Sequence, residues 1–234
     1  MGLIAEDVVL LTLDDATGRP VRGLRRRGKR DVLIGGALLA ELALNGSVDV
    51  RRGFFGLSAK LRPVTAGAPA DALLQRAFIT VREKPRHPRA LVSRIGHQRF
   101  DYLAGVLVGR GVLRREQRRR SLTTTTVWPV LDSRSKQAVR DQIASVLLHD
   151  AQTDERTGTL IALLSAVDQA HRLFVSPSVP PRIVKRRAKQ IARAGWADDA
   201  VRNAIVATRH GVEFGGEFGA FGDGDGGGGG GGGD

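Results

Sequence analysis

Apolar residues recur at helical spacing in several separate segments of this chain, and this pattern constrains the fold more than any other feature. Between Gly36 and Gly46 the sequence GALLAELALNG places four leucines on one helix, and Asn45-Gly46 is a stop signal. The same spacing predicts helices over 70–81, 98–109, 135–149 and 182–194, and two more around 160–167 and 201–206. The sequence therefore predicts a mainly α fold.

A small β component accompanies the helices. Residues 47–51 alternate as a short strand does, and 112–132 reads as two extended arms of a β-hairpin with a basic turn region. Threonines, Val127 and Trp128 favour the second arm, and Pro129 suits a sheet edge. Before these elements, the apolar block 3–13 ends in a turn signal at 14–20.

The chain divides into one domain and a tail. With 234 residues and 41% apolar content, residues 1–212 suffice for a single core. Residues 213–234 are rich in glycine and hold five acidic residues and no basic one. A segment of this composition buries too little apolar surface to offset its ordering entropy, so we expect it to be disordered.

The charge balance indicates an anionic partner. Thirty-seven Lys and Arg residues face 24 Asp and Glu residues, for a net charge of +13. Such a surface attracts nucleic acid or the anionic inner leaflet of a membrane. The chain has no cysteine, which suits a cytosolic compartment, and the acidic start and the lack of a long apolar stretch predict membrane contact from the surface only.

No constellation of catalytic residues is recognisable. The five histidines lack metal-ligand spacing, and neither a phosphate-binding glycine motif nor a nucleophile elbow occurs. Asp14-Asp15 is a carboxylate pair, but its DDATG context is typical of a turn. We therefore expect a protein that is not an enzyme and that uses no cofactor or metal.

Three basic segments remain, at 22–30, 114–120 and 182–189. The third is interpreted as the solvated face of a helix, the default for charged residues. In the first two, which are expected in a loop and at a hairpin end, only Asp31 and Glu116 lie near the cations. Because their mutual repulsion is uncompensated, these two segments are candidates for contact with an anionic partner.

Four stretches together resemble a known family. They are LIAEDVVLLTLDDATGRP at 3–20, GALLAELALNGSV at 36–48, LAGVLVGRGVLRRE at 103–116 and WPV at 128–130. In this order they resemble the Golgi phosphoprotein 3 family, or GPP34 domain, and in particular its actinobacterial members. The resemblance covers residues 3 to about 208. It implies a single GPP34-like, mainly helical domain with a protruding β-hairpin that binds phosphatidylinositol 4-phosphate at a membrane surface.

The resemblance and the charge pattern together predict a peripheral module on the cytoplasmic, inner face of a bacterial membrane. In the family a tryptophan and arginines form the headgroup pocket, and these positions fall at about Arg26, Gly35, His97 and Phe100. Basic residues contribute about 1 kcal/mol each near an anionic bilayer, and Arg grips phosphate with two donors. The predicted headgroup-binding residues are Arg25, Arg26, Arg27, Lys29, Arg30 and Arg99. The predicted membrane-contacting hairpin residues are Arg118, Arg119, Arg120, Leu122 and Trp128, although packing of Trp128 against its own domain is favoured.

Two other functions stay open on the sequence alone. A helix followed by a basic hairpin over 98–131 is also typical of a winged-helix nucleic-acid-binding protein, although only Gln98, Arg99 and Arg110 are available to read bases. An adaptor that binds protein clients through the phenylalanines of its tail is the third class.

Overall fold

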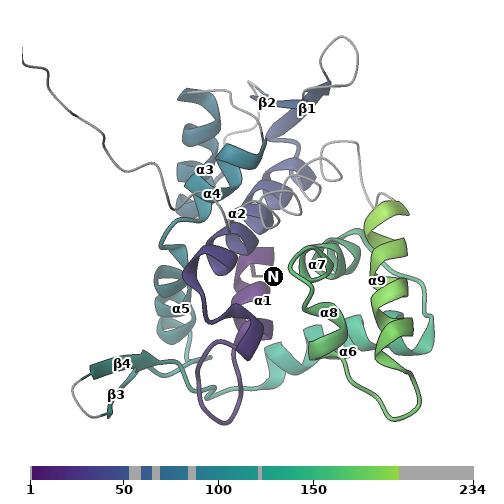
Figure 1. Ribbon diagram of the computed structural model, residues 1–234. Coiled ribbons are helices and arrows are strands. Elements are labelled where there is room, and N and C mark those ends of the chain that lie inside the picture. Colours follow the sequence, from purple (N-terminus) through teal and green to yellow (C-terminus); the bar gives the residue numbers. More distant parts are fainter. Residues whose placement is uncertain (1, 53–58, 65–68, 84–87, 121–122, 195–234) are drawn as a thin grey trace, which may run out of the picture.

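The computed structural model describes residues 2–52, 59–64, 69–83, 88–120 and 123–194, and every structural statement below refers to these residues. It is mainly helical with two small antiparallel hairpins, which confirms the predicted fold class. Figure 1 shows α1 and α2 at the centre, with α3, α4 and α5 on one side and α6 to α9 on the other. The predicted disordered tail and the helix expected at 201–206 lie outside the described residues.

Helix α1 (Ile4–Thr12) is the centre of the core. All nine of its residues are buried, and it contacts α2, α5, α6 and α7. The block 3–13 is apolar around most of its circumference, so a helix made from it is stable only when other helices surround it. None of the described helices is both long enough and apolar enough to cross a lipid bilayer.

Helix α2 (Arg27–Leu44) begins nine residues before the predicted Gly36, so half of the first basic segment is helical and not a loop. The sequence prediction was wrong because Gly35-Gly36 looked like a helix boundary. The structure uses Gly35 for close packing against α4 (Pro88–Gly96): a Cβ at Gly35 would collide with the carbonyl of Val92, and one at Gly96 with the carbonyl of Asp31. Two backbones can approach this closely only where side chains are missing.

The remaining helices enclose this centre. They are η1 (Arg22–Leu24), α3 (Ala72–Glu83), α5 (Arg99–Gly109), α6 (Arg134–His149), α7 (Glu155–Ala166), α8 (Ala170–Leu173) and α9 (Pro181–Ala194). Asp154 caps α7, since its carboxylate accepts a 2.7 Å hydrogen bond from the Thr157 amide. Helix α4, which was not predicted, begins at Pro88, a position where proline is tolerated.

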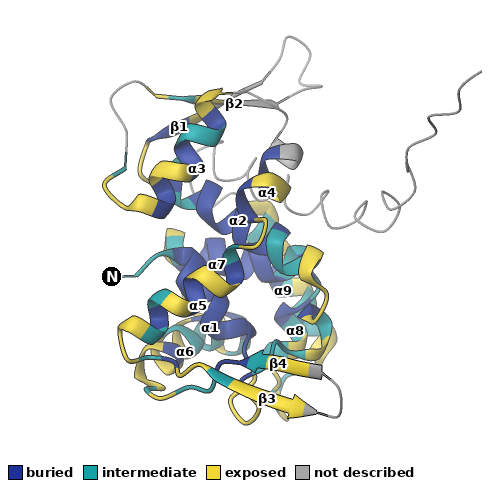
Figure 2. Ribbon diagram, turned by 90° about the vertical axis from the view of Figure 1, so that its left-hand side faces the viewer, coloured by how far each residue is buried: buried dark blue, intermediate teal, exposed yellow. Residues whose placement is uncertain are grey.

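Both β-ladders are hairpins. Strand β1 (Val48–Arg52) pairs with β2 (Ala59–Pro63), which the sequence did not reveal, and β3 (Glu116–Arg120) pairs with β4 (Thr123–Val127) as expected. In the second hairpin Arg118 faces Thr125 and Arg119 faces Thr124. Figure 1 shows β3 and β4 extending from the helical body, and Figure 2 shows exposed residues along β3.

The turn at 14–20 holds the base of the β3–β4 hairpin. Gly18, with φ +63°, accepts a 2.7 Å hydrogen bond from the Trp128 amide, and a Cβ there would collide with the backbone at Pro129. Asp14 accepts hydrogen bonds from the amide and hydroxyl of Thr17, which lower its pKa, so the interpretation of Asp14 as a turn residue is confirmed. The hairpin therefore starts from a fixed base.

Candidate functional site

The first basic segment forms the N-terminus of α2. Arg26 is the N-cap residue, no side chain caps the helix, and the first turn contains cations and no acid. This is the reverse of the usual arrangement, because the free amides and the dipole give a helix N-terminus partial positive charge and favour acidic residues there. The positive charge at the N-terminus of this 18-residue helix is therefore not compensated by an acidic side chain in the first turn. A bound anion would compensate it.

Most of these cations are free. Arg25, Arg26 and Arg27 are exposed and Lys29 is half-buried. Within the described part of the chain, none of the four forms a hydrogen bond or an ion pair. Leu24, at the start of the segment, is buried in the core and anchors the neighbouring backbone. The cations that follow it are therefore positioned by packing and not by ion pairs.

Arg30 connects this segment to the first turn of α5. Its guanidinium lies 4.5 Å from the centroid of the Phe100 ring, and its Nε is buried without a hydrogen-bond partner in the described structure. Burial lowers the pKa of Arg30, and nearby Asp101 and Asp31 partly oppose this effect. Asp31 lies 3.4 Å from His97, so it is shared between two basic side chains. A donor left unsatisfied next to free cations is consistent with an anion-binding surface.

Arg99 lies elsewhere. It lines a hollow of about 20 Å³ between α3, α4 and α5, together with Arg76, Arg94 and the half-buried Thr80. The three arginines have no ion pair to any described residue. The structure therefore does not group Arg99 with Arg25 to Arg30, and it reveals Arg76 and Arg94, which sequence reasoning missed because they belong to no basic run.

The hairpin is less basic in effect than its sequence indicates. Glu116 forms an ion pair with Arg114 and a second, at 3.3 Å, with Arg118. The repulsion among these arginines is thus partly compensated, contrary to the expectation from sequence. Arg119 is exposed and has no partner among the described residues. Arg120 is described only as the end of β3, and Leu122 lies outside the described residues.

Trp128 packs inward. It is 5% exposed and belongs to the core, and Arg115 lies over its ring at 5.9 Å from the centroid. This agrees with the favoured packing of Trp128 against its own domain. In its place at the foot of the hairpin, Trp128 forms the wall of a pocket next to α5.

The third basic segment lies away from the hairpin. Helix α9 and the hairpin lie at opposite edges of the molecule in Figure 1. Lys185 pairs with Asp168 at 2.7 Å, and Arg187 donates to the carbonyls of Leu147 and Leu148 at the end of α6. The other cations of the segment, Arg182, Arg186 and Lys189, are exposed. These three side chains lie on a solvated face of α9, which is the interpretation that the sequence favours.

Two further arginines form ion pairs with buried acidic residues, and the sequence did not predict these pairs. Arg110 donates to Glu6 at 2.7 Å, and Arg156 donates to Asp7 at 2.6 Å and lies 3.8 Å from Glu41. Burial raises the pKa of both Asp7 and Glu41. Because Arg110 is held by Glu6, it is not a free donor for base recognition. In the described ranges no group of three or more His, Asp or Glu residues is arranged to hold a metal ion.

Fold and surface together define a helical domain with a projecting hairpin and an unneutralised cationic helix start. The chain belongs to the Golgi phosphoprotein 3 (GPP34) family, whose model matches residues 4–208. A comparison with curated protein sequences finds no match. Of the positions of the family's headgroup pocket, Gly35 is closed to any larger side chain by α4, and His97 and Phe100 contact Asp31 and Arg30.

Proposed function

We propose that this protein is a peripheral membrane module that binds anionic phospholipid through the start of α2 and the β3–β4 hairpin. The observation that carries the proposal is the α2 N-terminus, where Arg25, Arg26, Arg27 and Lys29 have no partner among the described residues and no acid occupies the first turn. Clustered cations adhere to an anionic leaflet with about 1 kcal/mol each. The family resemblance supports phosphatidylinositol 4-phosphate as the headgroup.

The role proposed is binding and not catalysis, at the cytoplasmic, inner face of the membrane. The cationic α2 start and the hairpin both flank α5: Arg30 stacks on Phe100, and the neighbouring Asp101 lines one pocket with Arg115. A contiguous arrangement of this kind lets both segments meet one flat surface. Protein clients, if the module retains any, would then bind a face away from the lipid.

Sedimentation with liposomes of graded anionic and phosphoinositide content tests the proposal, alongside retention of duplex DNA on a filter. We expect pelleting with acidic vesicles that weakens as salt rises, because exposed charges are screened. Arg25→Glu with Arg26→Glu removes two attractive contributions and adds two repulsive ones, so the loss approaches about 4 kcal/mol, or roughly 10³-fold in affinity.

Arg182→Glu with Arg186→Glu on α9 is the matched control, since it makes the same change in net charge on a helix at the edge opposite the hairpin. We expect it to keep most of the binding. An equal loss in both double variants would show that net charge alone matters and that the surface is wrongly assigned. Retention of DNA without pelleting would favour the winged-helix nucleic-acid function instead.

A further inference from the structure

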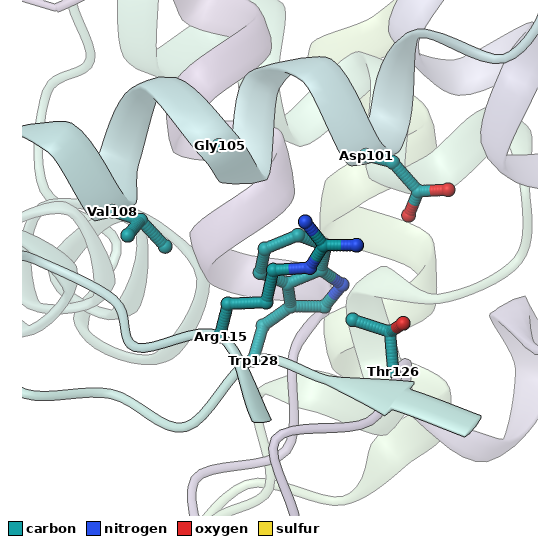
Figure 3. A pocket seen from close by; sticks show the side chains of 6 residues that line it. All are labelled: Asp101, Gly105, Val108, Arg115, Thr126 and Trp128. Carbon is teal, nitrogen blue, oxygen red and sulfur yellow. The ribbon is translucent and has the colours of Figure 1, made fainter. Parts of the chain in front are cut away.

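A pocket of about 330 Å³ lies between α5 and the foot of the β3–β4 hairpin. Asp101, Gly105 and Val108 line it from the helix, and Arg115, Thr126 and Trp128 line it from the hairpin side (Figure 3). The volume is at the lower end of the range for small-molecule sites. The floor is the buried Trp128, whereas Asp101 and Arg115 at the rim are exposed.

Three polar groups of this pocket make no hydrogen bond. Asp101 and Arg115 form no hydrogen bond or close ion pair within the described structure, although Asp101 lies near enough to Arg30 to raise the pKa of that arginine, and the indole N–H of Trp128 has no hydrogen-bond acceptor there. Figure 3 shows the Asp101 carboxylate and the Arg115 guanidinium entering the same space from the two walls. Elsewhere on this surface an exposed acid pairs directly with a neighbouring arginine, as Glu116 does with Arg118.

The separation of this charge pair has a structural cause. The guanidinium of Arg115 is held over the Trp128 ring, 5.9 Å from its centroid, and Asp101 is fixed on the rigid first turn of α5. The pocket therefore presents an acceptor and a donor of opposite charge on facing walls. A ligand that carries a cation and an anion a few bonds apart is complementary to such a site.

We propose that this pocket binds a phosphoethanolamine group, with its primary ammonium on Asp101 and its phosphate on Arg115 and the Trp128 N–H. The proposal deepens the proposed function, on which its membrane form rests. The same chemistry occurs as a lipid headgroup and as the free molecule. The Asp101 carboxylate disfavours a purely anionic ligand such as an inositol phosphate. A trimethylated ammonium cannot donate to Asp101, and the indole face that could accept it is covered by Arg115.

Gly105 keeps the pocket open. A Cβ at this position meets no atom within 4 Å, although a glycine inside a helix lowers stability. Gly105→Leu should therefore fill the pocket while raising the melting temperature by about 2 °C, because it replaces glycine with a good helix former. Gly109→Leu is the matched control, since Gly109 is also open on the same helix but does not line the pocket.

Calorimetric titration of the full chain with phosphoethanolamine, phosphocholine and inorganic phosphate tests the site. We expect phosphoethanolamine to bind at least tenfold more tightly than the other two. Asp101→Asn and Gly105→Leu should each reduce its affinity at least tenfold, and Gly109→Leu should not. Equal affinity for phosphoethanolamine and phosphocholine, or unchanged binding by Gly105→Leu, would overturn the proposal.

Vesicles separate the two sources of the ligand. At constant anionic content, replacing phosphatidylcholine by phosphatidylethanolamine should increase pelleting if the headgroup is bound, and this increase should vanish in Asp101→Asn. General electrostatics predicts the opposite sign for that variant, because removing a carboxylate makes the surface more cationic. Binding of free phosphoethanolamine without the vesicle effect identifies the soluble molecule as the ligand.

Failure of this proposal is distinguishable from failure of the membrane function. Pelleting with acidic vesicles but no affinity for phosphoethanolamine overturns the pocket assignment and leaves the cationic surface in place. Affinity for phosphoethanolamine without any pelleting supports the pocket and refutes the membrane role.

Discussion

Removing Arg156 should lower the free energy of unfolding more than any substitution on the protein surface. Arg156 is one-fifth exposed, and it donates to Asp7 at 2.6 Å and to the carbonyl of Gly2 at 2.6 Å, with Glu41 at 3.8 Å. Arg156→Ala leaves both carboxylates buried with no compensating cation. The loss of one partner of a buried ion pair lowers the free energy of unfolding by about 3 to 5 kcal/mol. Because Arg156 is partly exposed, we expect a loss of about 3 kcal/mol for Arg156→Ala at neutral pH.

The size of this effect should depend on pH. Burial already raises the pKa of Asp7 and Glu41 above their unfolded values, and Arg156 counteracts part of that rise. Without Arg156 both pKa values rise further. A group with a raised folded pKa binds its proton more tightly in the folded state, so stability increases as pH falls from the folded pKa toward the unfolded one. The variant should therefore recover part of its lost stability relative to the wild type as the pH falls from neutral toward the unfolded pKa of the two carboxyls.

Urea unfolding of both proteins at pH 7 and pH 5 measures this difference. Adding Glu41→Gln to the variant should restore part of the lost stability, because one buried charge is removed together with its cation. A loss of stability that stays constant between the two pH values, or that grows on acidification, would refute the argument that uncompensated carboxylates cause it.

Three further predictions concern the fold. Gly35→Ala should lower the free energy of unfolding by about 1 to 3 kcal/mol in urea denaturation, because its Cβ meets the α4 backbone, whereas Gly28→Ala in the same helix, which meets nothing, should raise it by up to about 1 kcal/mol. Lys136→Met should cost about 1 to 3 kcal/mol by calorimetric melting, since it leaves the buried carbonyl of Leu13 without its 2.7 Å donor. Asp154→Ala should cost about 1 kcal/mol, with faster amide exchange confined to the first turn of α7.

Local sequence patterns predicted most of the longer helices and the second hairpin, because amphipathic spacing and turn residues act within short segments. The start of α2 could not be located in this way. Gly35-Gly36 has the composition of a helix boundary, and only the tertiary approach of α4, through Gly96, explains why the helix continues across it. Strand β2 was missed for a similar reason, since a ladder is defined by its partner.

The candidate site, too, could be predicted from the sequence only in part. The run from Arg25 to Arg30 is visible in the sequence, whereas the packing of Arg30 on Phe100 is not. The meeting of Asp101 with Arg115 and Trp128 is not visible, because it depends on how the hairpin folds back on α5. Glu6 and Asp7, which the sequence shows only as an acidic start, have partners more than 100 residues away.

The central position of α1 has a consequence for biosynthesis. Its partners include α5, α6 and α7, the last of which ends at Ala166. At about 5 to 20 residues per second, roughly ten to thirty seconds pass between translation of α1 and the emergence of α7 from the ribosome. During that interval a largely apolar helix has no completed core in which to bury its side chains. Nascent chains should therefore recruit holdase chaperones to this segment, and expression should respond more to translation speed than to temperature.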